Sequence, residues 1–167
     1  DEIACVANTI LTKLGENVAL QGNPLNKSSI DNKSSFAGKK AVLCRTNARA
    51  MELLLHGVKK GHQVALQADV ERIGRFVSAA ERLKAGKLVQ DVPELAWFNS
   101  WDDVHEYCET NEGSDLKTLV RLVDDYGTAR LEKVIQQARN VTHPDYVIST
   151  AHKAKGLEWS HVQIQDD

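Results

Sequence analysis

The sequence has few of the features that assign a protein to a class at first sight. Aromatic residues make up only 5% of the 167 residues, and the formal net charge is −2, so any contact with nucleic acid requires a local basic patch. No apolar run approaches the ~20 residues of a membrane-spanning helix, and the first residues carry no basic-then-apolar signal. The three cysteines, Cys5, Cys44 and Cys108, show no C-x-x-C spacing. This spacing argues against a disulfide framework or a zinc site and indicates a protein of a reducing compartment. Because no run is long enough to span a membrane, we expect no membrane partner.

The N-terminal region divides into a helical segment and a polar segment. Residues 2–14 carry apolar side chains at helical spacing and end before Gly15, which predicts an amphipathic helix. Residues 21–40 are rich in Asn, Ser, Lys and Gly. Their composition predicts a long, mobile surface loop.

The stretch AVLCRTNARAMELLLHGVKKG predicts a strand, a helix and a second strand. Residues 41–44 form a short continuous apolar run, as expected for a strand that is covered on both faces. Asn47 is expected to cap the helix, Gly61 to end it, and residues 62–66 to form the next strand. This order predicts a parallel sheet with a right-handed crossover.

The middle of the chain is expected to be helical. Asp69 is predicted to cap one helix, and Ser100 with Asp103 forms the pattern of a capping box. The strand pattern returns at residues 146–150 and again at 161–164, and both strands are expected to be buried. The chain is therefore predicted to be an α/β domain whose parallel sheet is interrupted by helices.

Two segments of the helical region allow more than one interpretation. Residues 102–116 carry six acids and no Lys or Arg, which fits a solvated helix face or a docking surface. The stretch WFNSW, residues 97–101, fits core packing or the stacking of bases.

Polar clusters follow two of the predicted strands, where parallel α/β sheets bind ligands. Arg45 follows the first strand; its guanidinium is able to hold a phosphate in a bidentate fork, or to pair with a surface carboxylate. The second cluster, residues 150–158, reads TAHKAKGLE. Gly156 permits a positive φ, His152 and the lysines suit a sugar–phosphate backbone, and Glu158 is able to accept the hydroxyls of a ribose.

These two clusters resemble motifs of a known family. AVLCRTNARA and VISTAHKAKGLEWSHVQI look like motifs IV and V of superfamily 1 helicases of the UvrD/Rep/PcrA type, and the closest likeness is to the F-box helicase branch. The opening DEIACVANTIL resembles the helix after motif III. The resemblance covers residues 1–15, 41–66 and 146–167 and is faint between them.

The resemblance implies a role for each matching residue. Arg45 corresponds to the motif IV arginine, a catalytic residue that reaches the γ-phosphate of ATP, and Glu158, with Gly156, to the part of motif V that binds the nucleotide. Thr150, His152 and Lys155 correspond to positions beside single-stranded DNA, whereas Lys153 stands where the family varies, so we expect it to be auxiliary.

The resemblance also implies a fold and an incomplete motor. It implies that residues 1–167 form part of a RecA-like domain with a parallel sheet, as in the second motor domain of P-loop NTPases. The helical insertion at residues 67–143 stands in place of a short 2B-type subdomain. This sequence lacks the phosphate loop, the Asp-Glu pair for Mg²⁺ and the motif VI arginine. We therefore expect that ATP and Mg²⁺ bind between this chain and a first RecA-like domain on other sequence. That domain would carry the Mg²⁺ ligands.

The predicted function is an ATP-dependent DNA helicase or translocase of a class associated with DNA repair. Its partner is expected to be single-stranded DNA or a junction of single and double strands, and a bacterial source would imply a cytoplasmic, nucleoid-associated protein. Two alternatives stay open: a non-catalytic helicase-like module for nucleic-acid binding or assembly, and an unrelated α/β interaction domain.

Overall fold

The computed structural model describes residues 2–31 and 40–166, and the chain divides into two compact units, residues 1–36 and 37–167. In the first unit, helix α1 (Glu2–Lys13) confirms the amphipathic helix, and the backbone then turns at a positive φ of 78° in Gly15. Two hydrogen bonds between the Asn8 side chain and the backbone of Leu20, 2.7 and 2.9 Å long, hold the following segment against α1. Residues 16–31 form neither helix nor strand, while residues 32–39 of the predicted loop lie outside the described residues.

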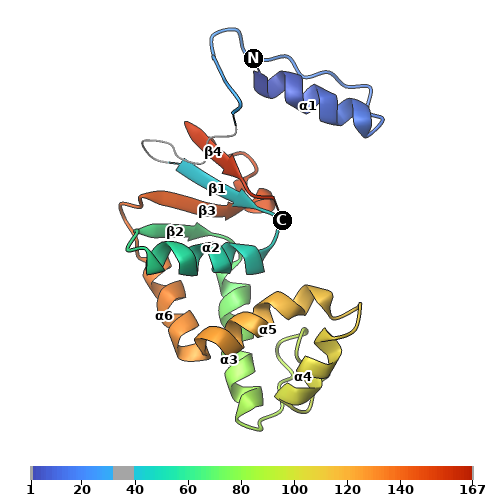
Figure 1. Cartoon of the computed structure of the whole chain (residues 1–167), viewed down its shortest axis with the longest axis vertical. Helices are drawn as coiled ribbons and strands as arrows, with labels where there is room; N and C mark the ends of the chain where they lie inside the picture. The colour runs from blue at the N-terminus through green and yellow to red at the C-terminus, as the bar shows by residue number, and fades with distance from the viewer. Residues whose placement is uncertain (1, 32–39, 167) are drawn as a thin grey trace. The chain divides into compact units, whose positions relative to one another are not determined.

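The second unit is built on a four-stranded sheet whose strands are all parallel, as predicted. Its strands are β1 (Lys40–Cys44), β2 (Val64–Gln67), β3 (Tyr146–Thr150) and β4 (His161–Ile164), in the order β2-β3-β1-β4. Strand β3 therefore lies between the two strands of the predicted strand–helix–strand unit (Figure 1).

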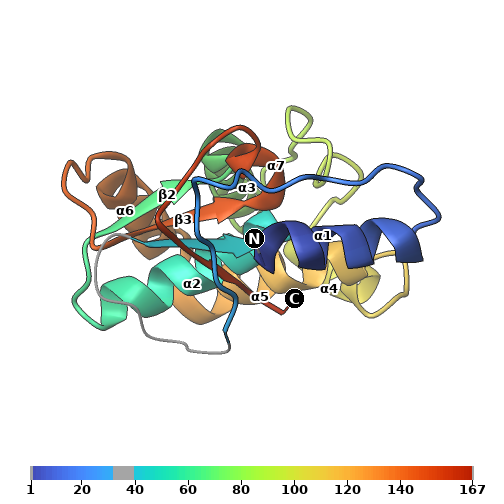
Figure 2. The same ribbon diagram turned by 90° about the horizontal axis from the view of Figure 1, so that it is seen from above.

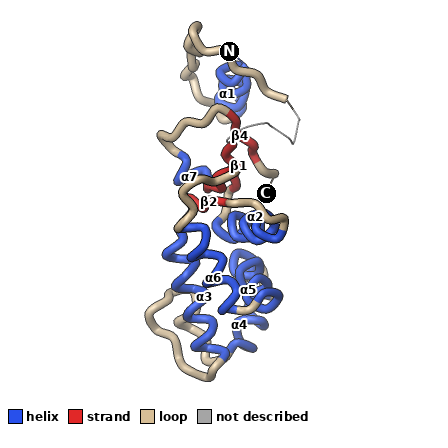
Figure 3. Tube along the Cα trace, turned by 90° about the vertical axis from the view of Figure 1, so that its left-hand side faces the viewer, coloured by secondary structure: helices blue, strands red, loops and turns tan. Residues whose placement is uncertain are grey.

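Helix α2 (Asn47–Lys59) covers one face of this sheet. Its apolar side, which includes the fully buried Met51 and Leu54, belongs to the same core as Val64 of β2 and Ile148 of β3. Burying each such side chain contributes roughly 1.5–3 kcal/mol to folding. The short helix α7 (Ala151–Ala154) lies on the other side of the sheet from α2 (Figures 2 and 3).

Four helices between β2 and β3 extend the core beyond the β2 edge (Figure 3). They are α3 (Val70–Lys84), α4 (Trp101–Cys108), α5 (Ser114–Tyr126) and α6 (Thr128–Arg139). Helix α6 packs against β2 and α3, so the apolar faces of these helices continue the core of the sheet. None of the described helices is long and apolar enough to cross a membrane.

The helix caps test the local predictions most directly. Asp69 caps α3 with its carboxylate at 3.1 Å from a backbone N–H, and Ser100 and Asp103 form the predicted capping box at α4. The prediction for α2 was wrong, because the Thr46 hydroxyl accepts the first-turn N–H at 3.1 Å and Asn47 is already helical. Both side chains are chemically able to cap a helix, so the sequence alone does not distinguish them.

The expectation that β4 is a buried strand was also wrong. Among residues 2–31 and 40–166, strand β4 forms an edge of the sheet and pairs only with β1. Val162 and Ile164 consequently expose 41% and 79% of their surface. The apolar run was correctly assigned to a strand, but apolar composition does not distinguish a central strand from an edge strand.

Candidate nucleotide and nucleic-acid site

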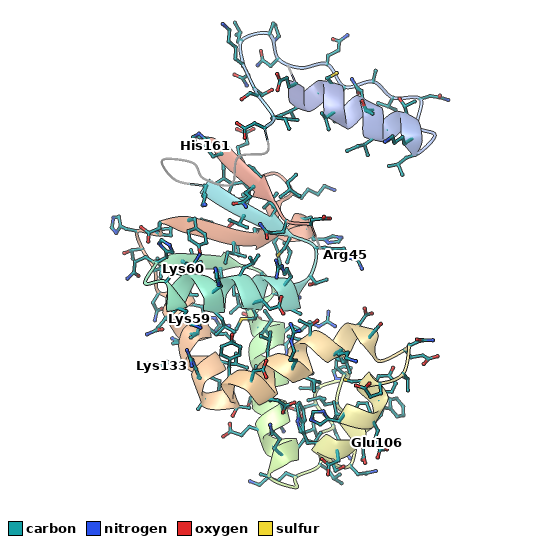
Figure 4. The ribbon with its side chains drawn as sticks, in the orientation of Figure 1. Arg45, Lys59, Lys60, Glu106, Lys133 and His161 are labelled. Carbon is teal, nitrogen blue, oxygen red and sulfur yellow. The ribbon has the colours of Figure 1, made fainter. Side chains whose placement is uncertain are left out.

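The candidate site lies where the parallel strands reach their carboxyl ends. Cys44, the last residue of β1, is paired with Thr150, the last residue of β3. Because Arg45 follows the first of these residues and α7 follows the second, the two predicted clusters begin on adjacent central strands. The expectation that both lie at one edge of the sheet is confirmed, and Figure 4 shows Arg45 at that edge.

The turn between β1 and α2 is held by contacts to the end of β3 and to the start of α3. The Cys44 thiol lies 3.6 Å from the backbone oxygen of Ser149 in β3. The Asn47 side-chain oxygen accepts the N–H of Asp69 at 3.2 Å, which links the start of α2 to the start of α3. These contacts fix the backbone on both sides of Arg45, whose own side chain is exposed.

The second polar cluster, residues 150–158, forms a single helical turn, α7, after which the chain changes direction. After α7 the backbone takes a positive φ of 82° at Gly156, as expected for this position. The N–H of Leu157 donates to the Ala154 carbonyl at 3.0 Å and closes the turn. His152, Lys153, Lys155 and Glu158 are all exposed to solvent. The turn therefore presents an imidazole, two ammonium groups and a carboxylate on a short, hydrogen-bonded frame.

Thr150 differs from the other predicted site residues because it is buried. It exposes only 5% of its surface and occupies the position before α7. The neighbouring Ser149 is fully buried, and its hydroxyl lies within hydrogen-bonding distance of the Gln67 and Thr150 carbonyl oxygens, at 3.0 and 3.2 Å. The structure thus brings Arg45 and the exposed α7 turn to one edge and leaves Thr150 beneath that surface.

A second basic region, which the sequence did not predict, lies along α2. A cleft of about 840 Å³ there is lined by the basic residues Lys40, Arg49, His56, Lys59, Lys60, His62 and Arg121, and by two acids, Glu52 and Asp125. Glu52 pairs with both Arg49, at 2.9 Å, and Arg121. Figure 4 labels Lys59 and Lys60 at the end of α2. Only the Lys-Lys dipeptide is visible in the sequence, because the other side chains come from separate elements.

The tryptophan-rich stretch contains one core residue and one exposed residue. Core packing is confirmed for Trp101, which is 8% exposed and donates its indole N–H to Asp124 at 2.9 Å. Trp97 instead exposes 87% of its surface. A single interpretation therefore does not describe the whole stretch.

The described residues do not offer a site for a metal ion. No group of three or more His, Cys, Asp or Glu side chains among residues 2–31 and 40–166 is arranged to hold one. The chemistry of this edge is that of one guanidinium, one carboxylate and a short basic turn, which is able to contact phosphates and a ribose.

The fold is an α/β fold with a four-stranded, all-parallel sheet flanked by helices, the arrangement of a RecA-like domain. The comparisons add particular relatives. The chain is 26% identical over 190 aligned positions to F-box DNA helicase protein 1 of Schizosaccharomyces pombe (strain 972 / ATCC 24843), and 27% identical over 191 positions to F-box DNA helicase 1 of Gallus gallus. The alignments cover 100% and 99% of this chain but 21% and 18% of the relatives.

This chain is therefore a distant homologue of a small part of F-box DNA helicases, and it spans about a fifth of the length of these curated relatives. No family model matches the chain. No solved structure matches it either. The relationship to helicases thus rests on curated relatives such as these, together with the parallel fold.

Proposed function

We propose that this chain acts as the second motor domain of an ATP-dependent DNA helicase or translocase. The observation that carries the proposal is the alignment of the whole chain with F-box DNA helicases from a yeast and a bird. It is supported by the pairing of β1 with β3, since both candidate clusters start at the ends of these two strands.

In this proposal the edge of the sheet forms one half of an ATP site. Arg45 reaches the γ-phosphate and stabilises the charge that develops there during hydrolysis, while Glu158 accepts the ribose hydroxyls and Gly156 lets the backbone approach the nucleotide. A first RecA-like domain supplies the phosphate loop and the ligands of Mg²⁺. The chain alone is then expected to lack ATPase activity, because half of the catalytic groups lie on the other domain.

The α7 turn is proposed to contact single-stranded DNA. His152 and Lys155 are exposed and able to donate hydrogen bonds to the sugar–phosphate backbone. The buried Thr150 is the residue directly before α7, which carries His152. Residues 67–143 take the place of a short 2B-type subdomain and lie between the two motifs in sequence.

The proposal is tested on a protein that joins this chain to its first motor domain. Arginine fingers in related phosphoryl transfers raise the rate on the order of 10³–10⁵-fold, so Arg45→Ala should lower kcat for ATP at least 10³-fold while oligonucleotide affinity changes little. Arg45→Lys should also be slow, since an ammonium lacks the planar fork. Arg75→Ala removes an exposed arginine of α3 and serves as the control.

The contact with DNA is tested by salt dependence. Lys155→Ala should weaken binding of a thymidine oligonucleotide and reduce the slope of log K against log salt concentration by about 1. Equal losses of ATPase rate and DNA affinity in Arg45→Ala would contradict the role of Arg45. DNA binding with no ATP turnover in the joined wild-type protein would instead identify a non-catalytic module.

A further inference from the structure

A cleft of about 700 Å³ opens between the helices of the insertion and the start of α2. Its walls come from the N-terminal ends of α2 and α3, from the connection before α4, and from α4 and α5. This volume lies in the range of sites that bind small molecules or side chains of a partner. None of the residues assigned to ATP or to DNA lines this cleft, although Thr46, the neighbour of Arg45, does.

Aromatic rings form much of the lining. Phe76 is buried in the floor, and the rings of Phe98 and Tyr107 lie against each other with centroids 5.4 Å apart. Trp97 also lines the cleft although 87% of its surface is exposed. An exposed tryptophan beside a concave, aromatic surface is the residue type that most often dominates protein interfaces.

The charge of the lining is negative. It holds one arginine, Arg72, and three acids. Arg72 is matched by Glu94, with its guanidinium nitrogens 2.6 Å from a carboxylate oxygen. Glu112 and Asp115 are exposed, and no basic side chain within the described ranges forms an ion pair with either of them. These carboxylates repel the phosphates of a nucleic acid and attract a cation.

We infer that this cleft is a docking site for a basic peptide segment of a partner protein. A lysine or arginine of that segment would meet both the carboxylates of Glu112 and Asp115 and the aromatic faces of the lining, to which a cation is attracted by the ring quadrupole. An apolar neighbour of that residue would cover Trp97. This inference is independent of the proposed motor function, because it uses none of the residues assigned to ATP or DNA.

The acidic surface outside the cleft extends the same charge. Asp102 and Glu106 of α4 are exposed, and Figure 4 shows Glu106 on the outer side of that helix. By contrast, Glu109 is paired with Lys117 at 3.2 Å and Asp103 belongs to the capping box. The exposed carboxylates of α4 therefore add negative charge to the helix that carries Tyr107 of the lining, which favours a basic occupant.

The test uses a fluorescein-labelled peptide, Gly-Arg-Leu-Lys-Arg-Leu-Gly, titrated with the chain at low salt. Trp97→Ala should weaken binding by about 5- to 30-fold, from the strength of a partly desolvated cation–π contact, and Trp97→Phe should recover part of the loss. Glu112→Gln combined with Asp115→Asn should weaken binding by about 3- to 10-fold and reduce its salt dependence. Glu132→Gln, an exposed acid of α6, is the matched charge control.

Three further measurements make the inference falsifiable. Trp97 is exposed, so its variants should keep the wild-type circular dichroism and urea midpoint, and unchanged peptide binding by folded Trp97→Ala would overturn the assignment. Equal binding of the charge-reversed peptide Gly-Glu-Leu-Glu-Glu-Leu-Gly would refute the role of the carboxylates. A thymidine oligonucleotide that displaces the basic peptide and quenches Trp97 would assign the cleft to nucleic acid instead.

Discussion

Asp124 joins three helices of the insertion, and its replacement provides the sharpest test of the packing. One carboxylate oxygen accepts the Lys84 ammonium of α3 at 2.8 Å and the Trp101 indole N–H of α4 at 2.9 Å. The other oxygen lies 3.2 Å from the His105 ring of α4. Because Asp124 itself belongs to α5, one side chain holds α3, α4 and α5 together.

The size of the effect follows from the groups that lose a partner. Trp101 is 8% exposed, so its N–H has little access to water, and leaving a buried donor without an acceptor costs about 1–3 kcal/mol. The Lys84 pair is partly exposed, with 31% of the Asp124 side chain accessible, and is worth at most about 1 kcal/mol. We expect Asp124→Ala to lower the free energy of unfolding by about 2–3 kcal/mol. Asp124→Asn keeps an acceptor and should cost about 1 kcal/mol.

The measurement is urea unfolding followed by tryptophan fluorescence. For a chain of this size, a loss of 2 kcal/mol corresponds to a fall in Tm of roughly 4–8 °C. Asp125→Asn is the matched control: the next residue is exposed, and no ion pair joins it to any part of the chain that the structure describes. A free energy of unfolding for Asp124→Ala within error of that for Asp125→Asn would refute the reasoning.

The pH dependence gives the same test a second readout. Burial acts to raise the pKa of Asp124, but the hydrogen bonds from Lys84 and Trp101 outweigh it, so the pKa lies below its ordinary value of 3.8. A group whose folded pKa is depressed stabilises the protein above its unfolded pKa, and this stabilisation is lost as the pH falls through the folded pKa. The stability difference between the wild type and Asp124→Asn should therefore shrink below about pH 3.8.

Two further predictions concern packing and thiol chemistry. A methyl group at Gly113 would overlap a backbone carbonyl oxygen, whereas one at Gly57 would first meet a tyrosine hydroxyl. Gly113→Ala should therefore lower the free energy of unfolding in urea by about 2–3 kcal/mol. This loss should exceed that of Gly57→Ala, because a backbone moves less easily than the end of a side chain. Cys5 is exposed while Cys44 and Cys108 are buried, and burial raises the pKa of the Cys108 thiol. One thiol should therefore react with Ellman's reagent in the native chain, and three should react in urea.

Local signals accounted for the elements of the fold, and the missing information concerned contacts between distant segments. Ser100 and Asp103 are three residues apart, so the sequence was sufficient to predict their capping box. Thr46 and Asn47 are both good capping residues, so the sequence alone did not show that Thr46 is the cap. The place of β3 between β1 and β2 is set by the pairing of Tyr146 with Val64, 82 residues earlier, and with Lys40, 106 residues earlier, and no local pattern encodes these pairings.

The candidate site shows the same division. The order of strands and polar clusters predicted that Arg45 and the turn around Gly156 share an edge, because all strands of a parallel sheet end on one side. Their roles toward ATP and DNA stay predictions. Thr150 was predicted both as the end of a buried strand and as a contact to DNA, and the structure shows it buried in β3, between the strands on either side. The acidic aromatic cleft is lined by residues of α3, α4 and α5 that are far apart in sequence, and no local pattern predicts that they line one cleft.

The strand order also has a consequence for how the chain is made. In the part of the chain that the structure describes, every pairing in the sheet involves either β3 or β4, and both strands follow the whole insertion in sequence. Although β1 is translated early, it has no partner in the sheet until the ribosome has added Tyr146. The nascent chain must therefore carry β1 and β2 with open backbone edges while α3 to α6 are synthesised, and such edges promote aggregation. Folding of the sheet is consequently expected to be a late event that needs nearly the entire chain.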